Sequence, residues 1–386
     1  MTRIKIISLF ATFLFVLLQD VVAGVLPDER IDALYHSYDG GGVEVNGPSI
    51  LIRKNVTNST SAFYNFYIDH ITSASIDVLT TGSPYIEERT EQTLGVDYLH
   101  NKTTLSLSAT NSSENDYQAK TFSFSLSQDF FGDLSTLTMG YSQGDDTVSK
   151  VGSDINPLSN IDRRSYRLGL TQILTKNSSM SVSWETITDQ ATELNDSGVT
   201  LNNPYRSFSY LNSSGGRSYA PEQYPNTRTS NAISIRGNYF LWNNTALHAD
   251  YRYFFDSWDI TANNYGISYV VPTGNWIFDV RYRHYSQSSA FFYSDLFDSA
   301  TEYTFMGRDK ELSTYTNDSI GVSASYGFAK NGWGWIDRGS LNLSWDYLSF
   351  SYDNFRDNSD DNIPPEEQPL YSFDANVIQG FVSIWY

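Results

Sequence analysis

The last ten residues of the chain, 377–386, read VIQGFVSIWY and end on an aromatic side chain. Every second position up to that end carries an apolar, aromatic or small residue, namely Ile378, Gly380, Val382, Ile384 and Tyr386. Successive side chains of a strand point to opposite faces, so a period of two indicates a strand whose two faces differ chemically. The end of the chain is therefore predicted to be a strand with one face in apolar surroundings.

The same alternation recurs from residue 42 onward. Phe122, Phe124 and Leu126, for example, alternate with serines. Similar segments lie at 105–107, 137–141, 166–170, 180–185, 233–239, 247–253, 265–271, 276–282, 320–328 and 341–347. Helical periodicity is hard to find, and about fifteen candidate strands can be counted, which predicts an all-β chain.

Connections of two lengths separate these strands. Short polar turns are predicted near residues 55–59, 100–102, 130–133, 176–177, 242–244 and 272–275, and long loops at 73–90, 144–162, 190–227, 289–316 and 354–372. Short turns at one end and long loops at the other are typical of a transmembrane β-barrel, which normally has an even number of strands. A weak strand at 32–39 would bring the count to about sixteen, and fourteen also satisfies the parity. The predicted fold is a closed antiparallel transmembrane β-barrel.

The N-terminal residues have the pattern of a secretory signal peptide. Arg3 and Lys5 precede an apolar run at 6–18, and residues 21–23 supply the small-residue cleavage pattern. An uncleaved N-terminal helix is the alternative. The expected organisation is a signal peptide at 1–23, a segment with a candidate first strand at 24–41 and the barrel at 42–386. The apolar runs are too short for a transmembrane helix, so a membrane would have to be crossed by strands.

Composition narrows the function classes. Of the 386 residues only 18% are charged and 15% are aromatic, which fits a lipid-facing surface. The net charge of −19 disfavours nucleic-acid binding, which needs clustered basic side chains on phosphates. The absence of cysteine excludes disulfides, cysteine-ligated metals and thiol nucleophiles. No cofactor is predicted.

The placement of aromatic residues bears on which face is outside. Many large rings, including Tyr98, Tyr239, Trp242 and Trp276, flank the short turns, as in the aromatic belts at membrane interfaces. A soluble sandwich with its rings turned inward would show the same alternation. The barrel is favoured because it also accounts for the signal peptide, the two classes of turn and the aromatic terminus.

Seven stretches resemble a bacterial family of uncharacterised outer-membrane proteins, domain of unknown function 3570. They include YHSYDGGGVEVNGPSILIRK at 35–54, TFSFSLSQDFFGDLSTLTMGYS at 121–142, ALHADYRYFFDSW at 246–258 and YSFDANVIQGFVSIWY at 371–386, with shorter matches at 73–91, 201–207 and 308–314. The resemblance implies an exported protein of the outer membrane of a Gram-negative bacterium, and it brings no known activity. The last strand also resembles the signal by which the barrel-assembly machinery recognises its clients.

Charged residues alternate with the apolar ones in three of the predicted strands. On the barrel interpretation they line the lumen, and they are Arg236, His248, Asp250, Arg252, Asp279, Arg281 and Arg283. Facing arginines and carboxylates could select small ions or solutes. Alternatively they form a structural ladder of paired charges, since buried charges are normally paired. This ladder is the favoured interpretation.

Other candidate sites are weaker. His248 lies two residues before Asp250 on the same strand face, a spacing that could orient an imidazole for acid–base chemistry. A nearby serine is uninformative in so serine-rich a chain, and no catalytic or metal-binding residue is assigned. The acidic segment 353–367 lacks the ligand spacing of a calcium loop and is better explained as a solvated external loop.

Three functions remain open on this evidence. A passive or weakly selective pore for small solutes comes first, because barrels of this size leave an aqueous channel unless something fills it. The second is a scaffold that presents its loops to partner proteins in the envelope. The third, an outer-membrane hydrolase, would have His248 as its best candidate residue. The protein is not expected to be an enzyme, and outer-membrane lipid is its expected surrounding.

Overall fold

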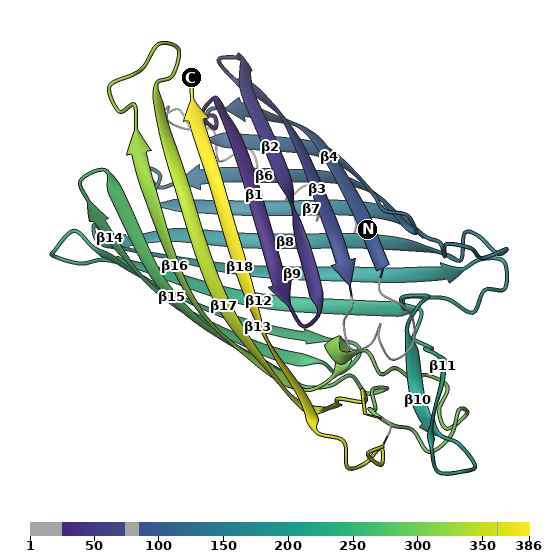
Figure 1. The fold of residues 1–386 in the computed structure, drawn as a ribbon. Coiled ribbons are helices and arrows are strands. Elements are labelled where there is room, and N and C mark those ends of the chain that lie inside the picture. Colours follow the sequence, from purple (N-terminus) through teal and green to yellow (C-terminus); the bar gives the residue numbers. More distant parts are fainter. Residues whose placement is uncertain (1–24, 74–84, 361) are drawn as a thin grey trace, which may run out of the picture.

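In a computed structural model, which describes residues 25–73, 85–360 and 362–386, the chain forms a closed antiparallel β-barrel of sixteen strands (Figure 1). The expected signal peptide at 1–23 lies outside the described residues, as do residues 74–84 of the expected loop at 73–90. The prediction of an all-β barrel with about sixteen strands is confirmed. Among the described residues, no helix has the length and hydropathy needed to cross a bilayer.

The strands are long, most of them between 11 and 17 residues. The barrel strands are β1 (Arg30–Gly40), β2 (Val43–Thr57), β3 (Thr60–Ser73), β4 (Tyr85–His100), β5 (Thr103–Ser113), β6 (Tyr117–Phe130), β7 (Ser135–Val148), β8 (Ser159–Thr175), β9 (Ser178–Glu193), β12 (Thr227–Phe240), β13 (Ala246–Asp256), β14 (Thr261–Thr273), β15 (Trp276–Gln287), β16 (Tyr315–Phe328), β17 (Arg338–Arg356) and β18 (Leu370–Trp385). A hairpin of β10 (Ser207–Leu211) and β11 (Arg217–Pro221) lies in the connection from β9 to β12, and a 3₁₀ turn, η1 (Lys310–Leu312), precedes β16.

Consecutive barrel strands pair with each other around the ring, and β9 pairs with β12 because the β10–β11 hairpin is a separate sheet. The weak strand expected at 32–39 is β1. It pairs with β18 from Arg30 opposite Trp385 to Gly40 opposite Ala375, and this pairing closes the barrel. Closure leaves the ring without an unpaired edge, as a bilayer requires.

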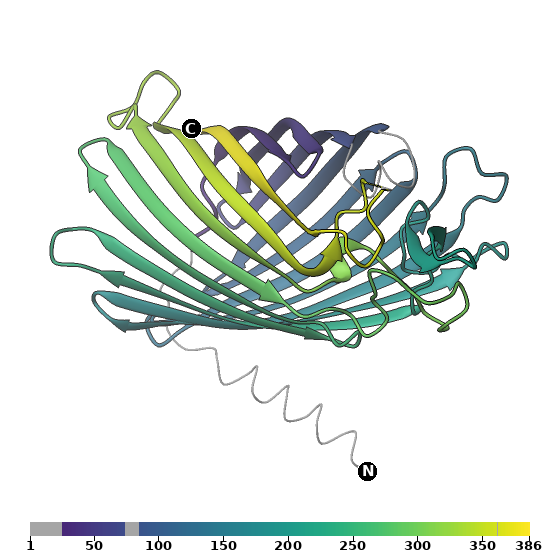
Figure 2. The same cartoon turned by 60° about the horizontal axis from the view of Figure 1, so that its bottom comes forward.

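The connections sort to two ends of the barrel (Figure 2). One end, the turn end, holds both ends of the barrel sequence and the short links at 58–59, 101–102, 131–134, 176–177, 241–245 and 274–275, together with 329–337. The other, the loop end, holds 149–158, 194–226, 288–314 and 357–369, and also the tight links at 41–42, 114–116 and 257–260. The strands reach several residues further into the loops than the alternation of apolar residues indicates.

The outer face of the barrel is apolar. Directly opposed residues of antiparallel strands share a face, and the opposed pair Trp345 and Ile378 is 43% and 49% exposed. The same face carries Leu343 at 59% exposure and Ile320 at 56%. Rows of exposed aliphatic and aromatic side chains around a closed sheet identify a lipid-facing surface, so the strands span a membrane.

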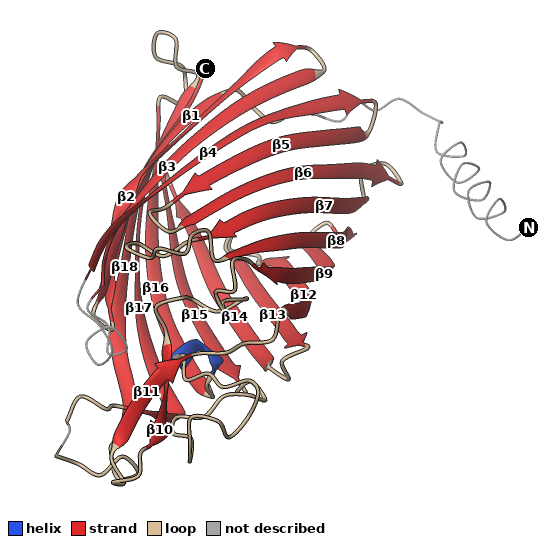
Figure 3. Ribbon diagram, turned by 90° about the vertical axis from the view of Figure 1, so that its right-hand side faces the viewer, coloured by secondary structure: helices blue, strands red, loops and turns tan. Residues whose placement is uncertain are grey.

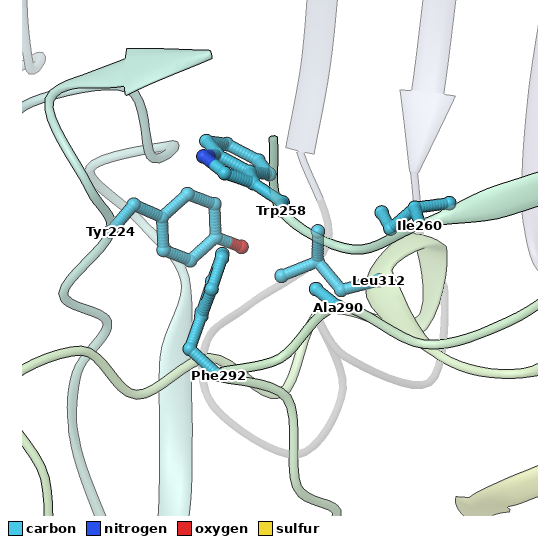
Figure 4. Packing of buried hydrophobic residues seen from close by; sticks show 6 residues of the cluster. All are labelled: Tyr224, Trp258, Ile260, Ala290, Phe292 and Leu312. Carbon is cyan, nitrogen blue, oxygen red and sulfur yellow. The ribbon is translucent and has the colours of Figure 1, made fainter. Parts of the chain in front are cut away.

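Buried apolar residues gather at the loop end instead. The largest cluster lies in the connections 194–226, 257–260 and 288–314 and combines Tyr224, Trp258, Ile260, Ala290, Phe292 and Leu312 (Figure 4). The Trp258 and Phe292 rings meet edge to face with their centroids 5.1 Å apart. Figure 3 shows β10, β11 and the 3₁₀ turn at this same end. The loops therefore fold into a packed unit, here called the loop assembly.

Candidate functional site: the charged wall of the lumen

All seven charged residues singled out in the sequence lie on inward-facing positions of the barrel. Arg236 is on β12, the positions 248, 250 and 252 are on β13, and 279, 281 and 283 are on β15. Exposed apolar residues such as Ile235 and Val280 alternate with members of this set. The three strands are not all adjacent, because β14 separates β13 from β15.

Arg281 is fully neutralised. Its guanidinium forms a bidentate ion pair with Asp346 of β17, with a Nε–Oδ1 distance of 2.7 Å, and a second pair with Asp279 at 3.3 Å. β16 lies between β15 and β17, and Gly321 is the residue directly between Arg281 and Asp346. A Cβ at Gly321 would collide with both charged groups. The absence of a side chain there lets the ion pair span three strands.

Arg252 and Arg167 share one carboxylate. Glu185 of β9 pairs with Arg167 of β8 at 2.5 Å and with Arg252 of β13 at 3.5 Å. Both arginine side chains remain open to the lumen, at 61% and 48% exposure. This part of the wall is thus paired but still in contact with water.

A third group lies in one row across four strands, in the order Arg236, Asp250, Gly266 and Arg283. The Asp250 carboxylate leans over Gly266, where a Cβ would collide with it. Its one hydrogen bond within the described part of the chain comes from Asn264 Nδ2 at 3.3 Å. Arg236 and Arg283 are exposed and have no ion partner among the residues that the structure describes. The row therefore carries charges that the wall itself does not neutralise.

A recess of about 390 Å³ opens in the wall at this level. It is lined by Asp250, Gly266, Ile267, Ser268, Arg281, Tyr282, Arg283, Ser319, Asp346, Leu348 and Val377. We call it the mid-lumen recess. Its volume falls within the range of small-molecule sites, about 300–1,000 Å³.

His248 does not form an acid–base pair with Asp250. Its Nδ1 contacts the side-chain oxygen of Asn238 on β12, whereas the Asp250 carboxylate points toward β14. The spacing along one strand brought the two residues to the same face, but the neighbouring strands hold them apart. The geometry offers no support for catalysis at this position.

The opposite part of the wall has a different lining. β6 stands across the ring from β16, and its inward positions Ser123, Ser125 and Ser127 are flanked by Ser106 and Ser108 of β5. This side presents hydroxyl groups, while the side from β8 to β17 presents ion pairs. A solute in the lumen would meet neutral donors and acceptors on one side and alternating charges on the other.

Sequence reasoning missed the other inward ion pairs. Arg53 of β2 pairs with Asp97 of β4, and His36 of β1 lies 2.8 Å from Asp69 of β3. Arg163 of β8 pairs with Asp189 of β9 at 2.6 Å. Asp97 alternates with Val96 and Tyr98, a signal that could have found it, but Arg163 lies between Asp162 and Arg164, where no alternation marks it.

The loop assembly contains a buried polar junction. Arg308 is 3% exposed and pairs with Asp295 at 3.0 Å, and it also donates to the carbonyl oxygen of Arg356. Arg217 of the hairpin lies 3.6 Å from the same Asp295 and donates to Gln368 at 2.8 Å. Three connections, 194–226, 288–314 and 357–369, are thereby joined.

Glu222 ties the hairpin segment to the next loop. One carboxylate oxygen accepts the backbone N–H groups of Arg308 and Asp309, at 2.6 and 2.8 Å, and the other accepts the Tyr224 hydroxyl. Burial, together with the nearby charge of Asp309, raises the pKa of Glu222 to about 7. The junction is therefore sensitive to protonation near neutral pH.

Acidic residues also gather at the loop end. Glu87, Glu114 and Asp116 each place a carboxylate oxygen within 4.8 Å of the others. Arg89 lies 3.7 Å from Glu114, and partly exposed acidic groups commonly cluster without an ion, so the group assigns no metal. In the acidic segment 353–367, the Asp360 carboxylate accepts the backbone N–H of Asn362 at 2.9 Å, as in a local turn.

The C-terminal pattern lies along β18. Ile378, Gly380, Val382 and Ile384 alternate on its outer face, opposite Leu343 and other apolar residues of β17. Tyr386 follows the strand, and its hydroxyl donates to the carbonyl oxygen of Arg53 at 3.1 Å. The aromatic end of the chain is thereby fastened at the turn end beside β2.

Comparisons with solved structures return other barrels. The chain resembles a bacterial polysaccharide outer membrane secretin, at 8% identity and a TM-score of 0.49, with 94% of this chain and 99% of that chain covered. It also resembles the outer membrane protein OpdK of Pseudomonas aeruginosa, at 10% identity and a TM-score of 0.42, with coverage of 93% and 99%. A loop deletion mutant of OmpT from Vibrio cholerae matches at 9% identity and a TM-score of 0.41, with 93% of this chain and 98% of that chain covered.

The family comparison is more direct. No match was found among curated protein sequences. The family model described as "Protein of unknown function (DUF3570)" matches residues 44–336, which run from β2 to the link before β17 and make up well over half of the chain. The resemblance noted in the sequence is confirmed, and the chain belongs to this family.

Proposed function

We propose that the protein is a weakly selective pore for small solutes in the outer membrane of a Gram-negative bacterium. The observation that carries the proposal is the exposure of inward side chains at mid-height, of which Arg167 at 61% and Arg252 at 48% are examples. If other parts of the chain filled the lumen, these arginine side chains would be buried beneath them. A sixteen-stranded barrel has room for an aqueous channel.

The charge pattern supports weak rather than strict selectivity. Most inward charges are paired, as Arg281 is with Asp346 and Arg53 with Asp97. Paired charges produce a field that changes sign over short distances, so neither cations nor anions are excluded. Together with the hydroxyl-lined side at β5 and β6, this wall suits small polar solutes.

The surroundings of the barrel are part of the proposal. The apolar outer face is suited to acyl chains, and the Tyr and Trp residues near the turn end, such as Tyr239 and Trp276, are suited to a lipid interface. The loop end would face outward and the turn end the periplasm. The alternating outer face of β18 with its aromatic terminus would be read by the barrel-assembly machinery.

Conductance of the purified, refolded chain in planar bilayers tests the pore. We expect discrete current steps whose size grows with salt concentration, and only a modest preference between potassium and chloride. Heat-denatured protein is the control. A correctly folded barrel, identified by heat-dependent gel migration, that stays silent at all voltages would refute the proposal.

A second role is favoured by the loop assembly. The Arg308–Asp295 pair and the Arg217–Gln368 hydrogen bond hold three connections in one arrangement, which offers partner proteins a preformed surface. Removal of residues 207–221 would then abolish co-purification of a stable envelope partner without changing conductance. If the deletion alters conductance and no partner is lost, the scaffold role is rejected.

A further inference from the structure

The mid-lumen recess contains two opposite charges that the wall leaves uncompensated. Arg281 and Asp346 neutralise each other there, and Asp279 adds a second carboxylate to Arg281. Among the described residues Asp250 and Arg283 have no such partner, and the one hydrogen bond to Asp250 comes from the neutral amide of Asn264. The recess is therefore electrically divided, with a free carboxylate on one side and a free guanidinium on the other.

The spacing of these two groups is set by the sheet. Gly266 of β14 lies directly opposite Asp250 of β13 on one side and Arg283 of β15 on the other. Two strand spacings separate their backbones, roughly 10 Å. No ion pair joins these two side chains, although both line the same recess. Because Gly266 has no side chain, no group fills the space between Asp250 and Arg283.

The rest of the lining combines two serines with apolar and aromatic side chains. Ser268 and Ser319 contribute hydroxyl groups beside the charged pair, and Leu348 and Val377 close the recess on the far side. A solute held here would have hydrogen-bonding partners between the two charges. The recess volume of about 390 Å³ is large enough for a molecule of a few heavy atoms with its water.

We propose that the mid-lumen recess is a binding subsite for small zwitterions of the α-amino acid class. The ammonium group pairs with Asp250 and the carboxylate with Arg283, so each free charge of the wall gains a partner. A simple anion pairs with Arg283 but is repelled by Asp250. A simple cation pairs with Asp250 but is repelled by Arg283. The inference rests on the proposed pore, because the solute reaches the recess through the lumen.

Binding to the folded protein in detergent micelles tests the subsite without requiring conduction. The probes are L-alanine, lactate and 1-amino-2-propanol, which share a three-carbon frame and differ in charge, and binding is measured by saturation-transfer NMR. We expect alanine to bind at least about threefold more tightly than either ion, which is the size of one partly exposed ion pair. Equal binding of all three probes, or no binding of alanine, overturns the proposal.

Variants assign the two ends of the ligand. We expect Arg283→Gln to weaken the binding of both alanine and lactate. Asp250→Asn should weaken the binding of alanine and strengthen that of lactate. The double exchange Asp250→Arg with Arg283→Asp keeps the preference for alanine, because a zwitterion can bind in the reverse direction. Loss of that preference in a double variant that migrates as a folded barrel contradicts the proposal. Arg164→Gln, on the outer face and paired with Asp162, removes the same charge and leaves binding unchanged.

The pore and the subsite can fail separately. If the barrel conducts and alanine does not reduce the single-channel current more than lactate does, the subsite is wrong and the pore stands. If alanine binds in micelles and the barrel never conducts, the pore is wrong and the recess remains a binding site.

Discussion

Arg281 of β15 and Asp346 of β17 are ion-paired across an intervening strand, with Gly321 of β16 beneath them. Direct neighbours in a sheet are the usual partners for a cross-strand pair. Here the pair reaches one strand further because the middle position has no side chain, and a Cβ would occupy the space of the Arg281 Nε atom and the Asp346 carboxylate. The lumen wall is thus shaped by glycine as much as by charge.

Gly321→Ala should destabilise the barrel. The added methyl group must displace Arg281 or Asp346, and overpacking of this kind costs about 1–3 kcal/mol. Urea unfolding in phospholipid vesicles measures the change. Gly169→Ala is the matched control, since this inward glycine of β8 has room for a Cβ at 3.8 Å from its nearest neighbour. Equal effects of the two substitutions would mean that the Arg281–Asp346 pair does not depend on the bare position.

Protonation of Glu222 should control how tightly the loop assembly is closed. Its pKa is raised to about 7 in the closed assembly, against 4.5 for a carboxyl group open to water. Between these values the closed form binds more protons, so the free energy of opening falls as pH rises from about 4.5 to 7 and levels off above that. Hydrogen exchange of the amides of residues 308 and 309, corrected for the intrinsic pH dependence, reports this opening.

Glu222→Gln serves as the comparison for that experiment. The amide oxygen still accepts the N–H groups of Arg308 and Asp309, but the side chain no longer titrates. Protection of those two amides should then be the same at pH 5 and pH 8. A variant with the pH dependence of the unmodified protein would assign the effect to another group.

Arg308→Met should release the loops and leave the barrel intact. The substitution leaves the buried Asp295 carboxylate with the more distant Arg217 and the backbone N–H of Arg356, and removal of one partner of a buried pair costs roughly 3 kcal/mol or more. Proteinase K treatment of proteoliposomes should cleave the variant within 194–226 or 288–314, while heat-dependent migration persists. Arg338→Met, which breaks the exposed pair with Asp28, should leave cleavage unchanged.

Most of the barrel could be predicted from the sequence. Strand alternation, such as that of Phe122 to Ser127, and the parity argument for a strand at 32–39 were sufficient for the sixteen strands. Strand ends were harder to predict, because β8 and β9 continue past the lipid-facing band to residues such as Asp162 and Thr192, where both faces meet water and the alternation is lost. The apolar pattern marks only the part of a strand that crosses the bilayer.

The pairing of charged side chains within the lumen wall could be predicted only in part. Alternation places Asp250 and Arg283 on the inward face, but which charges meet depends on strand order and on the position of glycines on the strands between. The loop assembly was beyond sequence reasoning, since Glu222 and Arg308 are 86 residues apart and no periodic pattern links them. Contacts between loops of this kind leave no local signal.

Leu343→Arg tests the lipid-facing surface. A charge on the outer face near the bilayer midplane costs about 2–4 kcal/mol in a transmembrane barrel. Ser344→Arg places the same side chain in the lumen, where water and carboxylates are at hand, and should cost much less. The difference is measured by urea unfolding in vesicles. Two variants of equal stability would argue against a lipid-facing position for Leu343.

Single-cysteine labelling tests the orientation of the wall most directly, because the chain has no cysteine of its own. Cysteine is placed in turn at each position from 122 to 127 of β6, and the folded protein in vesicles is treated with a charged, membrane-impermeant maleimide. The account predicts labelling at the serine positions 123, 125 and 127 and protection at Phe122, Phe124 and Leu126. The opposite phase, or labelling without alternation, would contradict a water-filled lumen inside an apolar outer face.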